Sequence, residues 1–136
     1  MTDSLTNPMM IDQILQAMPK VWAIYRFGSA GTPFERSDSD LDLAILTPRP
    51  ANNLARWALA QDLARQLRRD VDLVDLQSAS VVLRHQVFHQ GQRIYCADRF
   101  AAEEFESRAL SDYVRLNEAR RGILQDIYAW GRIHAG

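Results

Sequence analysis

Cysteine is almost absent from this sequence, since Cys96 is the only one among 136 residues. A single cysteine cannot form an internal disulfide, and it cannot supply the clustered thiolates of a structural zinc site. Long hydrophobic runs are missing too, because no apolar stretch approaches the roughly 20 residues that span a membrane. The first ten residues, MTDSLTNPMM, lack a basic segment followed by an apolar one, so we expect no secretory signal. A cytoplasmic location is the expectation that follows.

An excess of charge of one sign is also lacking. Sixteen basic and seventeen acidic residues leave a formal net charge of -1, so no overall positive field favours nucleic acid or an anionic membrane as a partner. The hydrophobic and charged fractions, 47% and 24%, are ordinary for a globular protein. At this length we expect one domain, residues 1–136, with a substantial hydrophobic core.

Strand-like segments alternate with helix-like segments along the chain. Segments rich in β-branched and aromatic residues predict strands at 21–27, 40–46, 70–76 and 93–96. Apolar residues at helical spacing predict a helix from Pro8 to Met18 with Asn7 as its N-cap, a helix begun by Asn52 or Asn53, a helix from Ser78 or Ser80 to Gly91, and one long or two abutting helices from Asp98. This order is typical of the α/β (α+β) class, with a sheet over about 20–97, helices packed on it and further helices over about 98–134.

Two aspartates interrupt the second predicted strand, DLDLAIL. Because side chains alternate in a strand, Asp40 and Asp42 point to one face and the leucines between them to the other. Carboxylates about 7 Å apart on one face repel each other and raise each other's pKa unless a cation lies between them. Mg²⁺ is typically held by one or two carboxylates plus substrate phosphates, and paired ions can clamp the attacking and leaving oxygens. The pattern therefore predicts a divalent-cation site; the alternative is a solvated edge strand that binds nothing.

The third predicted strand, DVDLVDL, is also acidic. Asp72 lies mid-strand between apolar residues, much as Asp42 does. If the two strands are neighbours, Asp72 would reach the same cation and orient or deprotonate an attacking hydroxyl. Asp70 and Asp75 are the alternatives, although Asp70 lies at the start of the strand and Asp75 faces away from Asp72 in a regular strand.

Gly28 and Ser29 directly follow the first predicted strand, and ten residues separate them from Asp40. Glycine lets the backbone turn sharply and approach a ligand closely. Successive backbone N–H groups at such a turn, together with the Ser29 hydroxyl, form an anion-binding nest suited to terminal phosphates. The two motifs together predict metal ions and a nucleotide bound side by side.

The stretch FGSAGTPFERSDSDLDLAIL, residues 27–46, resembles the GSx10DxD signature of the DNA polymerase β-like nucleotidyltransferase superfamily. The VDLVDL segment extends the match to Leu76, and beyond it the similarity is one of general layout. The small size is similar to that of the minimal nucleotidyltransferases, and the whole chain resembles MntA-type antitoxins, which pair with HEPN-domain toxins. Many minimal members carry an arginine directly after Gly-Ser, where this chain has Ala30. Arg26 and Arg36 are the candidates to replace it.

The resemblance implies a mixed sheet of about four strands that carries Mg²⁺, expected as two ions, and ATP. Antitoxins of this type transfer AMP from ATP to a tyrosine hydroxyl of the HEPN toxin, release pyrophosphate and silence the RNase activity of the toxin. An antitoxin that acts by contact alone, and a transferase for small hydroxylated molecules in the manner of aminoglycoside nucleotidyltransferases, are the alternatives. The residues implied to bind the nucleotide are Gly28, Ser29 and Ser39, and those implied to hold the metals and form the catalytic triad are Asp40, Asp42 and Asp72.

A protein acceptor is favoured by the length of the chain, because the signature and its sheet take up most of it. Nucleotidyltransferases for small molecules or nucleic acid usually add a domain that holds the acceptor. The segment from Phe100 to His134 is the predicted partner surface, since a final amphipathic helix must bury its apolar side somewhere. That side is predicted to consist of Phe105, Leu110, Val114, Ile123, Leu124 and Ile127.

His85 and His89 have the i, i+4 spacing of two zinc ligands on a helix. Their segment, HQVFH, lacks the glutamate of the HExxH motif, and no third ligand is evident. A surface or packing role is therefore predicted for both.

Overall fold

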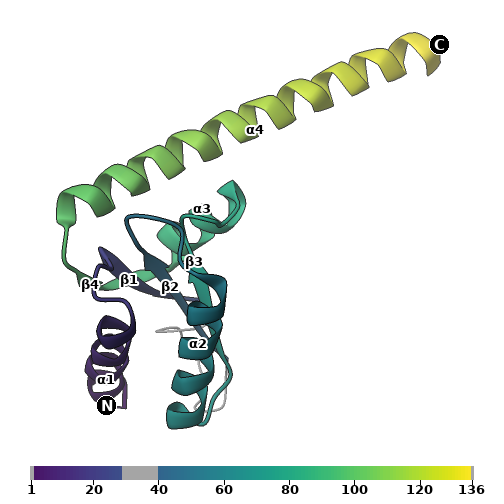
Figure 1. Cartoon of the computed structure of the whole chain (residues 1–136). Coiled ribbons are helices and arrows are strands. Elements are labelled where there is room, and N and C mark those ends of the chain that lie inside the picture. The colour runs from purple at the N-terminus through teal and green to yellow at the C-terminus, as the bar shows by residue number, and fades with distance from the viewer. Residues whose placement is uncertain (1, 29–39, 136) are drawn as a thin grey trace.

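The computed structural model describes the backbone of residues 2–28 and 40–135. Within those ranges helices alternate with strands, and Figure 1 shows a central sheet from which the last helix projects. The elements are α1 (Thr2–Ala17), β1 (Ala23–Phe27), β2 (Leu41–Leu46), α2 (Asn53–Leu67), β3 (Val71–Asp75), α3 (Val81–Gln90), β4 (Gln92–Cys96) and α4 (Arg99–Ala135).

The sheet is mixed, and its strand order is β3-β2-β1-β4. Strand β1 pairs antiparallel with both β2 and β4, whereas β2 and β3 run parallel. A parallel pair needs a crossover connection, and α2 supplies it. The predicted class, a mixed sheet of four strands with helices packed on it, is confirmed. Strand β3 is therefore an edge strand of the sheet formed by the described residues.

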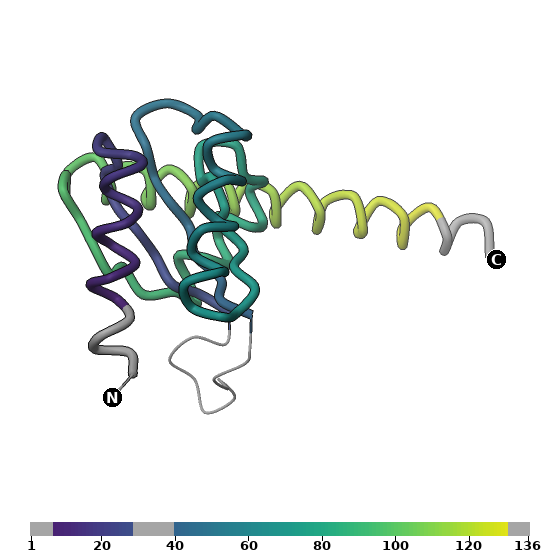
Figure 2. The backbone as a smooth tube through the Cα atoms, turned by 60° about the horizontal axis from the view of Figure 1, so that its bottom comes forward, coloured from purple at the N-terminus to yellow at the C-terminus, as the bar shows by residue number. Residues whose placement is uncertain are grey.

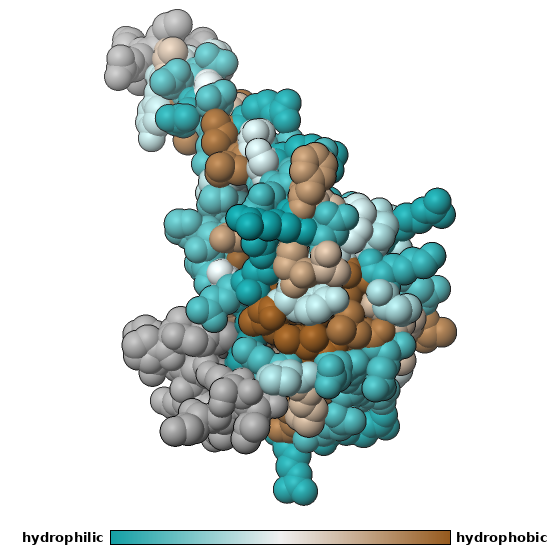
Figure 3. Space-filling model, turned by 90° about the vertical axis from the view of Figure 1, so that its left-hand side faces the viewer, coloured by the Kyte–Doolittle hydropathy of each residue, from teal (hydrophilic) through white to brown (hydrophobic). Residues whose placement is uncertain are grey.

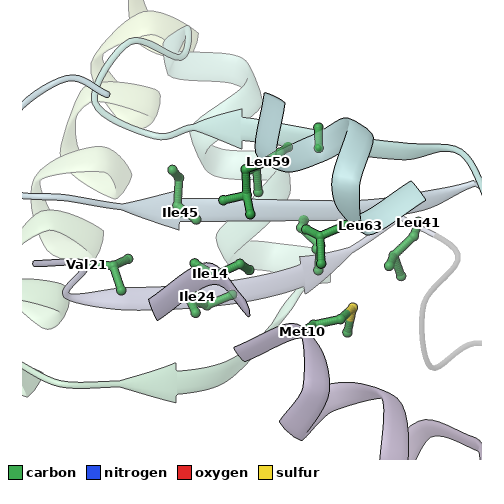
Figure 4. Close-up of a cluster of buried hydrophobic side chains, with 11 residues drawn as sticks. Met10, Ile14, Val21, Ile24, Leu41, Ile45, Leu59 and Leu63 are labelled. Carbon is green, nitrogen blue, oxygen red and sulfur yellow. The ribbon is translucent and has the colours of Figure 1, made fainter. Parts of the chain in front are cut away.

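One face of the sheet is covered by α1 and α2, which lie side by side (Figure 2). Their apolar sides meet the strand residues that alternate toward them, and none of the core side chains drawn in Figure 4 is more than 8% exposed. Leu59 and Leu63 are the buried leucines of α2. Burying one such leucine contributes about 1.5–3 kcal/mol, so this layer fixes the positions of β1 and β2.

The opposite face is covered by α3 and the first third of α4. Tyr25 and Phe27 of β1 pack there with Val87 and Phe105, and Phe88 meets the ring of Tyr25 edge to face at 5.3 Å. The buried Tyr25 hydroxyl donates a 2.6 Å hydrogen bond to Oε1 of Glu106 on α4. Burial first, and then the hydrogen bond and charge of Glu106, raise the pKa of Tyr25 above its usual range, so the phenol stays a donor.

The Tyr25 hydroxyl therefore ties α4 to the sheet, and Tyr25→Phe is expected to lower the free energy of unfolding. A hydrogen bond between a neutral donor and a charged acceptor contributes about 1–3 kcal/mol, and Glu106 keeps Arg93 as a partner at 3.5 Å. We expect a loss of about 1–2 kcal/mol in urea unfolding. Tyr128→Phe is the control, because Tyr128 is exposed. Equal losses in the two variants would contradict this role for Tyr25.

Helix ends follow the predicted capping residues in two cases. Asn52 caps α2 by accepting from the N–H of Ala55, and Ser80 caps α3 by accepting from the N–H of Leu83. Gly91 ends α3, as predicted. Each of the two N-caps resolves a choice that the sequence left open between neighbouring residues.

The predicted start of the first helix is wrong. Helix α1 begins at Thr2, and Pro8 lies inside it rather than at its first position. The Asn7 carboxamide oxygen accepts a 2.8 Å hydrogen bond from Nη1 of Arg26 instead of capping a helix. The Asn-Pro pair imitates a helix start, but a tertiary contact with β1 takes the side chain that would have served as the cap.

The C-terminal segment forms one continuous helix, one of the two predicted possibilities. Within the predicted apolar side, Phe105 is buried whereas the remaining residues are exposed in the isolated chain. The exposed ones are Leu110, Val114, Ile123, Leu124 and Ile127, at 45–60%. Among the described helices, α4 included, none combines the length and the apolar character that a membrane crossing demands.

The two histidines of α3 take part in ring packing. The His85 ring stacks on Tyr113 of α4 with 3.6 Å between centroids and 1° between planes. His85 and His89 also stack on each other at 5.4 Å. These contacts hold α3 against α4, which is the packing role that the sequence predicts.

Candidate active site

Asp42 lies at the centre of the candidate site, second along β2 and half-buried. The register of the sheet places it opposite Phe27, the last residue of β1, and opposite Asp72 on β3. Strands in a sheet lie about 4.8 Å apart, so Asp42 and Asp72 are direct cross-strand neighbours. The condition that the sequence analysis set for Asp72, that its strand adjoins β2, is met.

Asp42 and Asp72 point to the sheet face that carries α3 and α4. Each lies two positions before a residue packed on that face, Ala44 in β2 and Val74 in β3. Asp40 comes directly before β2 and is exposed, as is Asp72. The three carboxylates thus gather where β2 and β3 begin, with one of them half-buried between two that are open to solvent.

Crowding of these carboxylates changes the protonation of the central one. Burial first, then the charge of Asp72 and then that of Asp40, raise the pKa of Asp42 above its usual range. No basic group is among the causes of the shift, so a cation at this place would relieve the repulsion and lower that pKa. The site is therefore electrostatically suited to a positively charged ligand.

Gly28 adjoins the carboxylate of Asp42. Its φ is +74°, in the left-handed region that side chains with a Cβ rarely adopt, and a Cβ built there would overlap Oδ2 of Asp42. The sequence analysis predicted a turn and a phosphate contact for this glycine, but not its contact with Asp42. The sequence signal is a glycine directly after a strand; that the strand ends opposite Asp42 is known only from the sheet register.

The donor set fits a magnesium ion that shares its ligands with a substrate. In the described part of the chain, no three His, Cys, Asp or Glu side chains form a ready-made metal cluster. Mg²⁺ does not need one, since it keeps several waters and takes one or two carboxylates with phosphate oxygens. The neighbouring carboxylates of Asp42 and Asp72 are hard oxygen donors and match that requirement.

Of the two alternative aspartates, Asp70 adjoins the start of β2 but is not among the causes of the pKa shift of Asp42, and Asp75 is already engaged. Asp70 is exposed just before β3, where its carbonyl accepts from the N–H of Leu41 at 2.8 Å. Asp75 is buried, and its carboxylate accepts from the N–H groups of Ala51 and Gln77 and from the Ser78 hydroxyl. Asp75 therefore holds the ends of β3 and the start of α2 together, and of the three candidates on this strand Asp72 adjoins Asp42.

Several residues that the sequence analysis singled out lie outside the described residues. These are Ser29, Ala30, Arg36 and Ser39. Arg26 is described, and it alternates toward the face of Ile24, where its guanidinium donates to Asn7. The suggestion that Arg26 replaces the missing arginine at the phosphates does not fit this position, because Asp42 points to the other face.

Comparison with protein families gives one match that covers most of the chain. The family described as polymerase beta, nucleotidyltransferase, matches residues 10–100. That range contains β1 to β4 and every described residue of the carboxylate cluster.

Comparison with individual proteins points in the same direction. The chain is 42% identical over 112 residues to protein adenylyltransferase MntA of Shewanella oneidensis, covering 82% of this chain and 80% of that protein. A structure of the tri-AMPylated Shewanella oneidensis HEPN toxin in complex with MNT antitoxin matches with a TM-score of 0.77 and 39% identity, over 91% of this chain and 97% of that one. A toxin–antitoxin structure with AMP-PNP matches with a TM-score of 0.80 and 39% identity, over 89% and 97%.

Proposed function

Because the chain belongs to the nucleotidyltransferase family of the polymerase β type, we propose that it is an antitoxin that transfers AMP from ATP to a HEPN-domain RNase toxin. The observation that carries the proposal is the direct pairing of Asp42 with Asp72 beside the glycine turn at Gly28. The similarity to an MntA protein adenylyltransferase, and to a complex that contains an AMPylated HEPN toxin, supports the acceptor. We place the reaction in the cytoplasm, where ATP is supplied.

Asp40, Asp42 and Asp72 would hold Mg²⁺, which we propose as two ions, together with phosphate oxygens of ATP. When bound, such ions neutralise the triphosphate and stabilise the charge that develops on the attacking and leaving oxygens. The backbone at Gly28, with Ser29 and Ser39, would hold the phosphates. The half-buried position of Asp42 supports the role of central ligand, since its carboxylate gains most from a nearby positive charge.

Asp72 is the residue proposed to orient the acceptor. It is exposed on an edge strand, so a hydroxyl that arrives from a partner protein can reach its carboxylate from solvent. The tyrosine oxygen attacks the α-phosphorus of ATP, the bond from that phosphorus to the pyrophosphate oxygen breaks, and the hydroxyl proton passes to the Asp72 carboxylate. AMP remains on the tyrosine, and pyrophosphate leaves.

The proposal predicts a mass increase of one or more AMP groups on the cognate HEPN toxin when the chain, ATP and MgCl₂ are mixed. Intact mass spectrometry of the toxin measures it, and peptide fragmentation locates the modified tyrosine. Mixtures without MgCl₂, or with ATP replaced by its non-hydrolysable α,β-methylene analogue, are the controls and should show no increase.

Two outcomes separate the alternatives. If the chain protects cells but leaves the mass of the toxin unchanged with every nucleoside triphosphate, the result favours an antitoxin that acts by contact alone. Transfer of AMP to a small hydroxylated compound such as an aminoglycoside, with none to the toxin, would favour the small-molecule reading.

A further inference from the structure

Helix α4 consists of two parts with different surroundings. Up to about Tyr113 it packs on the sheet and on α3, and Ala102, Phe105 and Ala109 are buried there. From Val114 to Trp130 no described side chain is buried, and the helix runs away from the sheet (Figures 1 and 2). The second part is therefore a projecting arm whose side chains meet solvent.

The arm carries an apolar surface, which we call the distal stripe. Figure 3 shows apolar side chains among polar ones along this part of the molecule. A helix turns about 100° per residue, so residues spaced by three and four positions share one side. The distal stripe consists of Ile123, Leu124, Ile127, Tyr128 and Trp130, each between 51% and 69% exposed.

Nothing in the described part of the chain needs this stripe for folding, because the core already lies between the sheet and its four helices. A shallow hollow between Ile123, Asp126, Ile127 and Trp130 gives the stripe a shape into which a side chain can fit. Contiguous apolar surface of this kind on an exposed helix marks an interaction site.

The stripe carries charge as well as apolar surface. Arg120 lies one turn before Ile123 and Leu124, so it shares their side of the helix. Asp126 lines the hollow. A partner that offers apolar side chains, with a carboxylate opposite Arg120, would complement this surface.

The related complexes bear on which protein occupies the stripe. The structure that contains a HEPN toxin with MNT antitoxin matches 91% of this chain. The residues of this chain that lie outside the match are fewer than the residues of the arm. At least part of the arm is therefore matched. The relative whose structure contains the toxin therefore has residues that match part of the arm, which favours the toxin over a second copy as the occupant.

We propose that the distal stripe, together with Arg120, is the docking surface for the HEPN toxin, on which it contacts apolar side chains and a carboxylate. The inference rests on the proposed function for the identity of the partner. In this arrangement the arm binds the toxin, and the carboxylate cluster at the sheet edge modifies it.

Ile127→Asp tests the docking surface, because it places a charge at the centre of the stripe without touching the core. All variants are made in an Asp42→Asn background, which keeps the toxin unmodified. Calorimetry then measures the dissociation constant for the toxin, which Ile127→Asp is expected to raise on the order of 100-fold. Arg120→Glu is expected to raise it on the order of tenfold, and added salt should reduce that difference. Ala129→Asp, about 200° around the helix from Ile127, is the matched control and should stay within about twofold. Circular dichroism checks that all variants keep their helix.

The outcomes distinguish the docking surface from the function. If Ile127→Asp and Ala129→Asp bind the toxin equally well, the docking proposal is overturned, whether or not the unmodified chain transfers AMP. If Ile127→Asp disrupts binding but the unmodified chain adds no AMP, the proposed function fails while the docking surface stands. Sedimentation tests self-association. If the chain forms a dimer that Ile127→Asp dissociates, and toxin binding is unchanged, the stripe serves self-association and the proposal is overturned.

Discussion

Asp42→Asn is expected to abolish AMP transfer and, in the same protein, to raise the melting temperature measured without divalent cations. Transfer should fall on the order of 10³-fold or more, because the variant loses the central charge that would bind the metal. Stability should rise because the neutral amide removes the cost of burying a charge at this half-buried position and the repulsion by Asp72 and Asp40. A gain in stability that accompanies a loss of activity is typical of a site under functional constraint.

The pH dependence of this stability difference has a definite sign. The pKa of Asp42 is raised in the folded chain, so between its ordinary value of 3.8 and the raised value the folded state binds more protons than the unfolded state. The contribution of Asp42 to stability is therefore complete below pH 3.8 and is lost as the pH rises through the folded-state pKa. The stability advantage of Asp42→Asn should accordingly be present at neutral pH and vanish in acid.

Thermal unfolding at several pH values, with and without MgCl₂, measures these effects. Asp75→Asn is the matched control, since Asp75 lies in the neighbouring strand but its carboxylate is held by three hydrogen-bond donors. That variant should lower the melting temperature at neutral pH, opposite in sign to Asp42→Asn. If Asp42→Asn is less stable than the unmodified chain in metal-free buffer at pH 7, the repulsion described at this site is wrong.

Local signals in the sequence predicted the strands and most of the helices, whereas the mixed sheet was implied by the family resemblance. The alternation in DLDLAIL fixes which face Asp42 takes, and the caps at Asn52 and Ser80 follow from short-range hydrogen bonding. The first helix was misjudged for a different reason. Asn7 has the local character of a cap, but its partner is Arg26, and a contact between distant segments leaves no trace in the local pattern.

The candidate site was predictable in its residues but not in its arrangement. Alternation alone cannot tell whether Asp72 lies beside Asp42, because strand order is set by the crossover through α2 and by packing across the whole sheet. Periodicity likewise predicted an apolar side for α4. It could not tell that the side beyond Tyr113 is left exposed, since periodicity reports which residues share a face and not what covers them.

Gly28→Ala is expected to reduce AMP transfer on the order of 100-fold, because small displacements of catalytic groups have effects of that size. The added methyl group would overlap Oδ2 of Asp42, and the carboxylate would have to leave its position between Phe27 and Asp72. The backbone adds to the effect. At a φ of +74° a residue with a Cβ costs roughly 1–2 kcal/mol more than glycine, so stability should fall as well.

Gly122→Ala separates the local effect of Gly28→Ala from a general effect of adding a methyl group. Gly122 lies in the exposed part of α4, and a Cβ there meets nothing within 4 Å. Alanine should stabilise that helix by about 0.5–1 kcal/mol and leave AMP transfer unchanged. Transfer rates at saturating ATP and urea unfolding of both variants measure the contrast. Full activity of Gly28→Ala would mean that the glycine turn does not position the Asp42 carboxylate, and the catalytic assignment of this cluster would lose the contact on which it depends.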